Sequence, residues 1–147
     1  MDNQNEIEKL YRAEQQKYTY YIIGLCVACI GFSVVHTMGQ QLKLTQIPLG
    51  LAILSWSISI YYGFKFLQSG MGVLYNNFYM LEIEKGYDEE IGNNPEYIIS
   101  AKKGIFEATK SIAIKAERYF TRLIKMFFGG IIFFIAWHIT EMYFNIK

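Results

Sequence analysis

Three long apolar runs alternate with polar stretches along the chain. Charged side chains are absent from Tyr18–Met38 and Leu44–Phe64, and the third run, Leu123–Phe144, has an uncharged centre at Met126–Thr140. A helix needs about 20 apolar residues to cross a bilayer, and long basic side chains at its ends can snorkel to the interface. The pattern therefore predicts an all-α integral membrane protein with three transmembrane helices.

The polar stretches between these runs also have helical periodicity, so we divide the whole chain into predicted elements. These are a cytoplasmic juxtamembrane helix at 1–17, transmembrane helices at 18–38, 47–66 and 123–144, an external turn at 39–46, and a cytoplasmic helical hairpin at 67–122 with arms at 67–85 and 95–122.

The hairpin prediction depends on two sevenfold repeats. On the outgoing arm the repeat consists of Leu67, Met71, Leu74, Phe78 and Leu81, and on the return arm of Ile98, Ile105, Ile112 and Tyr119. Such spacing is typical of helices that pack along one seam. Lys85-Gly86 is a helix-end signal and Asn94-Pro95-Glu96 a helix-start signal. The tip between them is acidic (Asp88, Glu89, Glu90), and Gly70 and Gly72 are candidate hinge positions.

Orientation follows from the lysines and arginines beside each span. Nine lie from Lys65 to Lys125, in the segment that joins the second and third spans and at its edges, and three precede the first span. The first turn has Lys43 alone and the C-terminal tail Lys147 alone. Cytoplasmic loops carry the excess of basic residues. We therefore expect a multi-pass protein of the inner (plasma) membrane, with the N-terminus and hairpin in the cytoplasm and the C-terminus outside.

Composition fits this class and offers no catalytic chemistry. Hydrophobic residues make up 52% of the chain and the net charge is +1. Cys26 and Cys29 form a C-x-x-C pattern inside an apolar run, where we interpret them as small packing residues rather than as a redox or metal pair. Because the sequence has no phosphate-binding glycine loop, metal-ligand cluster or nucleophile–base set, we predict no enzyme activity and no cofactor.

A stripe of small and partly polar residues runs along the second span at helical spacing. Its members are Ala52, Ser55, Ser59 and Gly63. One interpretation is close packing against another helix, where small residues and interhelical hydroxyl bonds are common. The other is the lining of a pore in an oligomer.

Basic residues gather on the membrane-proximal half of the return arm. They are Lys103, Lys110, Lys115, Arg118, Arg122 and Lys125. One interpretation is anchoring to anionic lipid headgroups. The other is a ring of positive charge, formed by an oligomer, that binds an anionic ligand such as a nucleotide or oligonucleotide.

The order of elements resembles a known group of proteins. Tyr20-Tyr21-Ile22-Ile23-Gly24, a short turn, and Leu51–Phe66 running into a heptad-patterned helix are similar to the small helical membrane effectors of bacterial anti-phage operons linked to nucleotide signalling. The resemblance is architectural, and the third span departs from the two-span pattern. It implies a homo-oligomeric channel or membrane-disrupting effector controlled by a nucleotide-derived ligand.

The leading hypothesis from the sequence is thus a homo-oligomeric membrane channel gated through its hairpin. The alternatives are a non-conducting anchor or assembly subunit, whose hairpin docks a soluble cytoplasmic partner, and a holin-like lysis protein.

Overall fold

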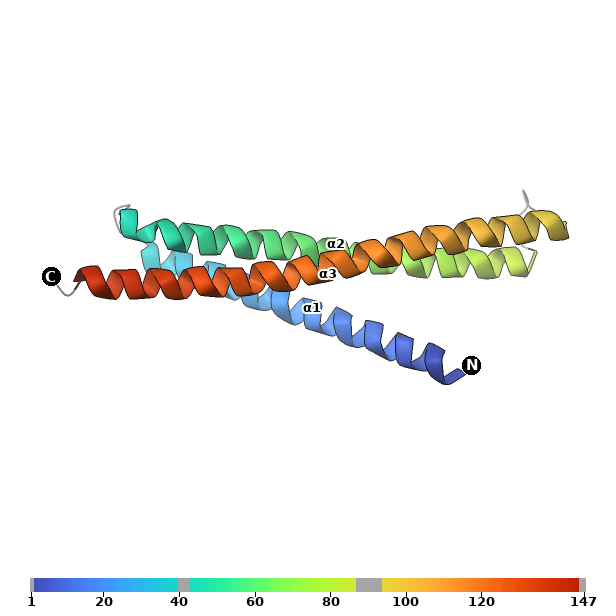
Figure 1. Ribbon diagram of the computed structural model, residues 1–147, viewed down its shortest axis with the longest axis horizontal. Helices are drawn as coiled ribbons and strands as arrows, with labels where there is room; N and C mark the ends of the chain where they lie inside the picture. The colour runs from blue at the N-terminus through green and yellow to red at the C-terminus, as the bar shows by residue number, and fades with distance from the viewer. Residues whose placement is uncertain (1, 40–42, 87–93, 146–147) are drawn as a thin grey trace. The chain divides into compact units, whose positions relative to one another are not determined.

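The computed structural model describes residues 2–39, 43–86 and 94–145, and these are helical almost throughout (Figure 1). Three α-helices follow one another, α1 (Asp2–Thr37), α2 (Ile47–Glu84) and α3 (Pro95–Asn145), and a short 3₁₀ helix η1 (Leu44–Gln46) precedes α2. The predicted all-α fold class is confirmed. Residues 40–42 of the expected external turn and the acidic tip at 88–90 lie outside the described residues.

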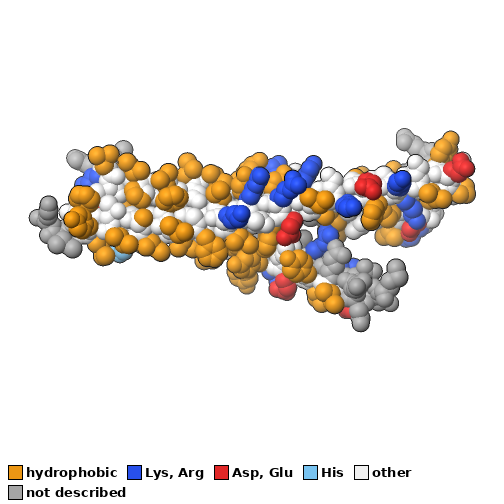
Figure 2. All heavy atoms as spheres, in the orientation of Figure 1, with side chains coloured by type: hydrophobic (Ala, Val, Ile, Leu, Met, Phe, Trp, Pro, Cys, Tyr) orange, Lys and Arg blue, Asp and Glu red, His pale blue; other side chains and the backbone are white. Residues whose placement is uncertain are grey.

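All three helices are long and apolar enough to cross a membrane. Within their most apolar stretches only 22%, 33% and 17% of the residues are buried inside the chain. Soluble proteins bury such surface, whereas lipid-facing helices expose it. Figure 2 shows hydrophobic side chains spread over the visible face of the apolar helices.

The helix ends follow the expected local chemistry. Asn94 Oδ1 accepts a 3.1 Å hydrogen bond from the backbone N–H of Glu96, which caps α3 in front of Pro95. Gly86 has φ 71° and follows the last residues of α2, as a left-handed helix-ending residue does. No break interrupts α3, so the return arm and the third apolar run form one helix of 51 residues. The helix α2 likewise continues through Gly70 and Gly72.

The chain forms two compact units, and α2 and α3 each contribute to both. The first unit, here called the bundle, comprises residues 1–64 and 120–147, and contains α1 with the first half of α2 and the second half of α3. The second unit, here called the hairpin, comprises residues 65–119.

The bundle has a small, tightly packed core. Ile22 and Cys26 from α1, Ala52 and Trp56 from α2, and Leu123 from α3 are all at most 2% exposed and contact one another. Gly130 of α3 lies against the indole ring of Trp56, so closely that a Cβ atom at this position would overlap the ring. Glycine is required at this crossing because it lets the two helices approach.

The hairpin consists of the second half of α2 packed against the first half of α3. Asn76 Nδ2 donates a 3.1 Å hydrogen bond to Thr109 Oγ1, and Lys102 pairs with Glu84 near the tip end. Val73 and Ile83 of α2 are buried, and Gly72 lies beside Ile112. The return-arm repeat Ile98, Ile105, Ile112 and Tyr119 is partly buried at this seam, as the sequence predicts.

The seam on α2, however, does not use the repeat that the sequence makes most visible. Met71, Leu74, Phe78 and Leu81 are 53–65% exposed, whereas Val73, Asn76, Met80 and Ile83 are buried or partly buried. Both sets repeat with heptad spacing, and at about 100° per residue they occupy different sides of the helix. The outgoing arm therefore has two heptad faces, one packed on α3 and one that no described residue of the hairpin covers.

Candidate functional site

The small polar stripe of α2 lies inside the bundle. Ala52 and Ser59 are fully buried, and Ser55 is 7% exposed. Ser55 Oγ donates a 2.7 Å hydrogen bond to the carbonyl oxygen of Met126, and Ser59 Oγ donates one of 2.8 Å to that of Leu123. The two hydroxyls thus join α2 to α3 at successive turns.

Gly63 completes this contact at the end of the stripe. A Cβ atom here would lie 2.8 Å from Ile23 Cδ1 on α1 and 2.8 Å from Leu123 Cδ1 on α3. All four stripe residues therefore face other helices of the same chain, in the arrangement that the packing interpretation expects. The alternative, a pore lining, requires a second arrangement in which Ser55 and Ser59 exchange their partners for water.

The six basic candidates of α3 are all exposed. Lys103, Lys110, Lys115 and Arg118 belong to the hairpin, and Arg122 and Lys125 to the bundle. The guanidinium carbon of Arg122 lies 5.5 Å from the centre of the Tyr62 ring on α2, a cation–π contact at the end of the bundle.

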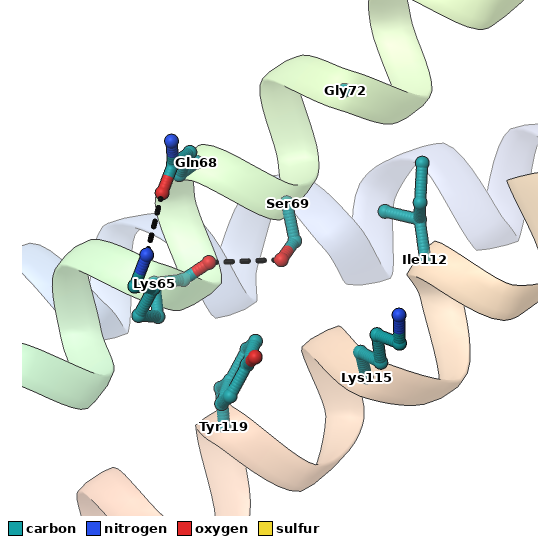
Figure 3. A pocket seen from close by; sticks show the side chains of 7 residues that line it. All are labelled: Lys65, Gln68, Ser69, Gly72, Ile112, Lys115 and Tyr119. Carbon is teal, nitrogen blue, oxygen red and sulfur yellow. Dashed lines mark hydrogen bonds between the residues drawn. The ribbon is translucent and has the colours of Figure 1, made fainter.

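Lys115, which is one of the six basic candidates, lines a pocket together with residues of α2. The pocket has a volume of about 250 Å³ and lies wholly within the hairpin, between the arms at the end nearer Lys65 (Figure 3). Its lining comprises Lys65, Gln68, Ser69, Gly72, Ile112, Lys115 and Tyr119. Lys115 was among the predicted anion ligands, whereas Lys65 was recognised only as a topological charge.

The pocket has cations on both arms and polar groups beside them. Lys65 Nζ donates a 3.3 Å hydrogen bond to Gln68 Oε1, and Ser69 Oγ donates one of 2.9 Å to the Lys65 carbonyl oxygen. In Figure 3 the Tyr119 side chain extends from α3 towards α2. The spacing within either arm does not show that Lys65 and Lys115 line one pocket, because that depends on how the two arms are aligned.

Metal and thiol chemistry find no support in the described part of the chain. No group of three or more His, Cys, Asp or Glu residues there could hold a metal ion. Cys26 is fully buried in the bundle core and Cys29 partly buried, and both are free thiols. Comparison of the chain with known protein families, curated proteins and solved structures found no match.

Proposed function

We propose that the protein is a three-span membrane assembly subunit: its bundle is embedded in the bilayer, and its cytoplasmic hairpin pairs with the hairpin of a second copy. The uncovered heptad face of α2 carries this proposal. We call it the outer stripe, and it consists of the exposed side chains of Met71, Leu74, Phe78 and Leu81, with the partly buried Leu67 at its start.

Helix length supports a projecting hairpin. A helix of 38 residues is about 57 Å long and one of 51 residues about 76 Å, at 1.5 Å per residue. The hydrocarbon core of a bilayer is about 30 Å thick. Both α2 and α3 therefore extend well beyond the bilayer, and the excess of lysine and arginine between the spans favours the cytoplasmic side for their projecting halves.

A second copy fits the outer stripe because the membrane fixes its direction. Two copies with the same topology send their α2 helices out of the bilayer in the same direction. In a parallel pair of helices each heptad position meets its own equivalent, so an apolar stripe faces an identical apolar stripe. The stripe has no charged residue from Leu67 to Leu81, so this pairing opposes no like charges.

The exposed area of the stripe is also sufficient for a specific contact. Met71, Leu74, Phe78 and Leu81 are each more than half exposed. With about 100 Å² available from each large apolar side chain, two stripes and their flanking residues approach about 1,000 Å², near the lower limit for a specific interface. Membrane anchoring adds to this, because it concentrates both copies in one plane.

Cysteine crosslinking in membranes tests the pairing. Met71→Cys and Phe78→Cys should each give a disulfide-linked dimer under mild oxidation, because equivalent positions of a parallel pair lie close together. Ser111→Cys, at an exposed site on α3 outside the stripe, is the matched control, and the unmodified chain with Cys26 and Cys29 sets the baseline. Equal crosslinking at Ser111→Cys, or none at either stripe position, would falsify the pairing.

The channel hypothesis is the second candidate, and flux distinguishes it from the first. It is favoured by the hydroxyls of Ser55 and Ser59, which are polar groups placed in the middle of an apolar helix. Liposomes containing the purified protein should remain sealed to ions if the bundle is only an anchor. Flux that changes with Ser55→Ala or Ser59→Ala, but not with Ser57→Ala, would favour a conducting state instead.

A further inference from the structure

We propose that the pocket between Lys65 and Lys115 is a binding site for a phosphate group that carries an organic substituent. The inference adds a ligand to the proposed membrane subunit, and it relies on that proposed function only for the location of the pocket beside the inner leaflet.

The charged side chains that line the pocket are both positive. Lys65 lines the pocket from α2 and Lys115 from α3. Among the described residues that line it there is no carboxylate. An ammonium group has three N–H donors, and a phosphate oxygen is a far stronger acceptor than the neutral amide of Gln68 that Lys65 Nζ contacts at 3.3 Å. Lysine side chains are flexible, so the ammonium groups of the two arms can turn towards one phosphate bound in the pocket.

The rest of the lining indicates that the phosphate carries a substituent. The lining includes the apolar side chain of Ile112, the open backbone at Gly72 and the aromatic ring of Tyr119. A volume of about 250 Å³ is larger than a bare phosphate needs. The apolar part suits an apolar or aromatic substituent on the phosphate, such as the acyl part of a lipid or the base of a nucleotide.

The position of the pocket along the sequence is compatible with two sources of the phosphate, a lipid headgroup and a soluble nucleotide. Lys65 is the first charged residue after the uncharged run that ends at Phe64, and Tyr119 and Lys115 come shortly before the third run. Lipid phosphates occupy this depth, and basic pockets at the cytoplasmic ends of transmembrane helices are typical headgroup sites. The same pocket is open to the phosphate of a soluble nucleotide.

The binding test compares two double variants that remove the same charge. Lys65→Gln with Lys115→Gln neutralises the pocket, and Lys103→Gln with Lys110→Gln neutralises two exposed lysines of the hairpin outside it. One arm titrates full-length protein in phosphatidylcholine nanodiscs with fluorescent phosphatidic acid. The other arm titrates full-length protein in detergent with ATP, so that it does not depend on membrane insertion or on pairing of the outer stripe.

We expect saturable binding in at least one arm. The pocket variant should weaken it by about tenfold or more, because two charge-assisted contacts are lost, and the control variant by about twofold at most. Binding of phosphatidic acid alone identifies a lipid headgroup, and binding of ATP alone a soluble ligand. Equal weakening by both double variants, or no saturable binding of either probe, overturns the proposal.

A third variant keeps every charge and reduces the space. A Cβ atom at Gly72 would lie 3.6 Å from Ile112 Cδ1, an ordinary contact, and the remaining carbons of Gly72→Leu would reduce the space at the pocket wall. Loss of binding in Gly72→Leu supports a shaped site. Unchanged affinity in this variant indicates general attraction to a basic surface and contradicts the proposal.

Discussion

Ser59 Oγ donates a hydrogen bond to the carbonyl oxygen of Leu123, from a residue that is fully buried between α2 and α3. Ser57, two residues earlier, instead donates to the Ile53 carbonyl oxygen of its own helix and is exposed. Two serines of the same run thus have different roles, one between helices and one within a helix.

Replacement of these serines should separate the two roles. We expect Ser59→Ala to lower the free energy of unfolding by about 0.5–1.5 kcal/mol, the range of interhelical hydrogen bonds in membranes. Ser57→Ala should change it by less than about 0.5 kcal/mol, as is usual for surface positions. Reversible unfolding in mixed detergent micelles measures both values, and equal losses would contradict the packing role of Ser59.

The stability lost when a glycine is replaced by alanine should depend on the atoms that surround that glycine. At Gly130 the new methyl group meets the rigid indole ring of Trp56, and at Gly63 it meets the flexible ends of Ile23 and Leu123. We expect a loss of about 2–3 kcal/mol at Gly130 and a smaller one at Gly63, because flexible side chains can move aside.

Gly24 is the matched control for this series. It lies on α1 with no neighbouring atom within 4 Å of the added Cβ position. Alanine there should be neutral or stabilise the helix by up to about 1 kcal/mol. Thermal unfolding of the three variants in one detergent tests the order, and a loss at Gly24→Ala as large as that at Gly130→Ala would rule out this account.

The comparison of sequence and structure is most instructive on α2. Spacing predicts a heptad repeat on each arm. The return-arm residues Ile98, Ile105 and Ile112 are partly buried, whereas most of the outgoing repeat is exposed. The side of α2 that meets it could not be chosen from hydrophobicity, because the structure pairs large residues of α3 with a seam that includes Gly72 and Asn76. Shape complementarity between segments far apart in the sequence decides this, and it leaves the more apolar face uncovered.

In the candidate sites, too, local spacing identifies which residues share a helix face, but it does not identify the distant residues that they contact. Periodicity identified the stripe from Ala52 to Gly63 and left packing and pore lining open. The acceptors of Ser55 and Ser59 lie 71 and 64 residues further along the chain, so no local pattern names them. That Lys65 and Lys115 line the same pocket likewise cannot be predicted from a local pattern, because it depends on the register of the two arms.

The predicted orientation in the membrane can be tested by labelling single cysteines. In sealed right-side-out vesicles, Lys43→Cys should react with a membrane-impermeant maleimide, whereas Ser111→Cys should react only after the vesicles are opened. The reason is the concentration of basic residues between the second and third spans, which stays on the cytoplasmic side. Reaction of Ser111→Cys in sealed vesicles would place the hairpin outside and reverse the proposed orientation.

Val73 and Leu74 provide the sharpest test of the two faces of α2, because they are neighbours with opposite surroundings. Val73 is 8% exposed at the hairpin seam and Leu74 is 65% exposed on the outer stripe. Val73→Ala should destabilise the hairpin by about 1–2 kcal/mol through lost packing. Hydrogen exchange of the hairpin amides in the detergent-solubilised monomer should then accelerate, because local opening becomes easier.

Leu74→Ala should leave that exchange unchanged and instead reduce dimer crosslinking through Met71→Cys in membranes. The two substitutions remove similar apolar groups from adjacent residues, so any general effect of lost hydrophobicity would appear in both. If Val73→Ala reduced crosslinking without any change in exchange, or Leu74→Ala accelerated exchange in the monomer, the assignment of the two faces would be wrong. The crossed outcome is expected because one face holds the arms of a single chain together and the other is the proposed contact between two chains.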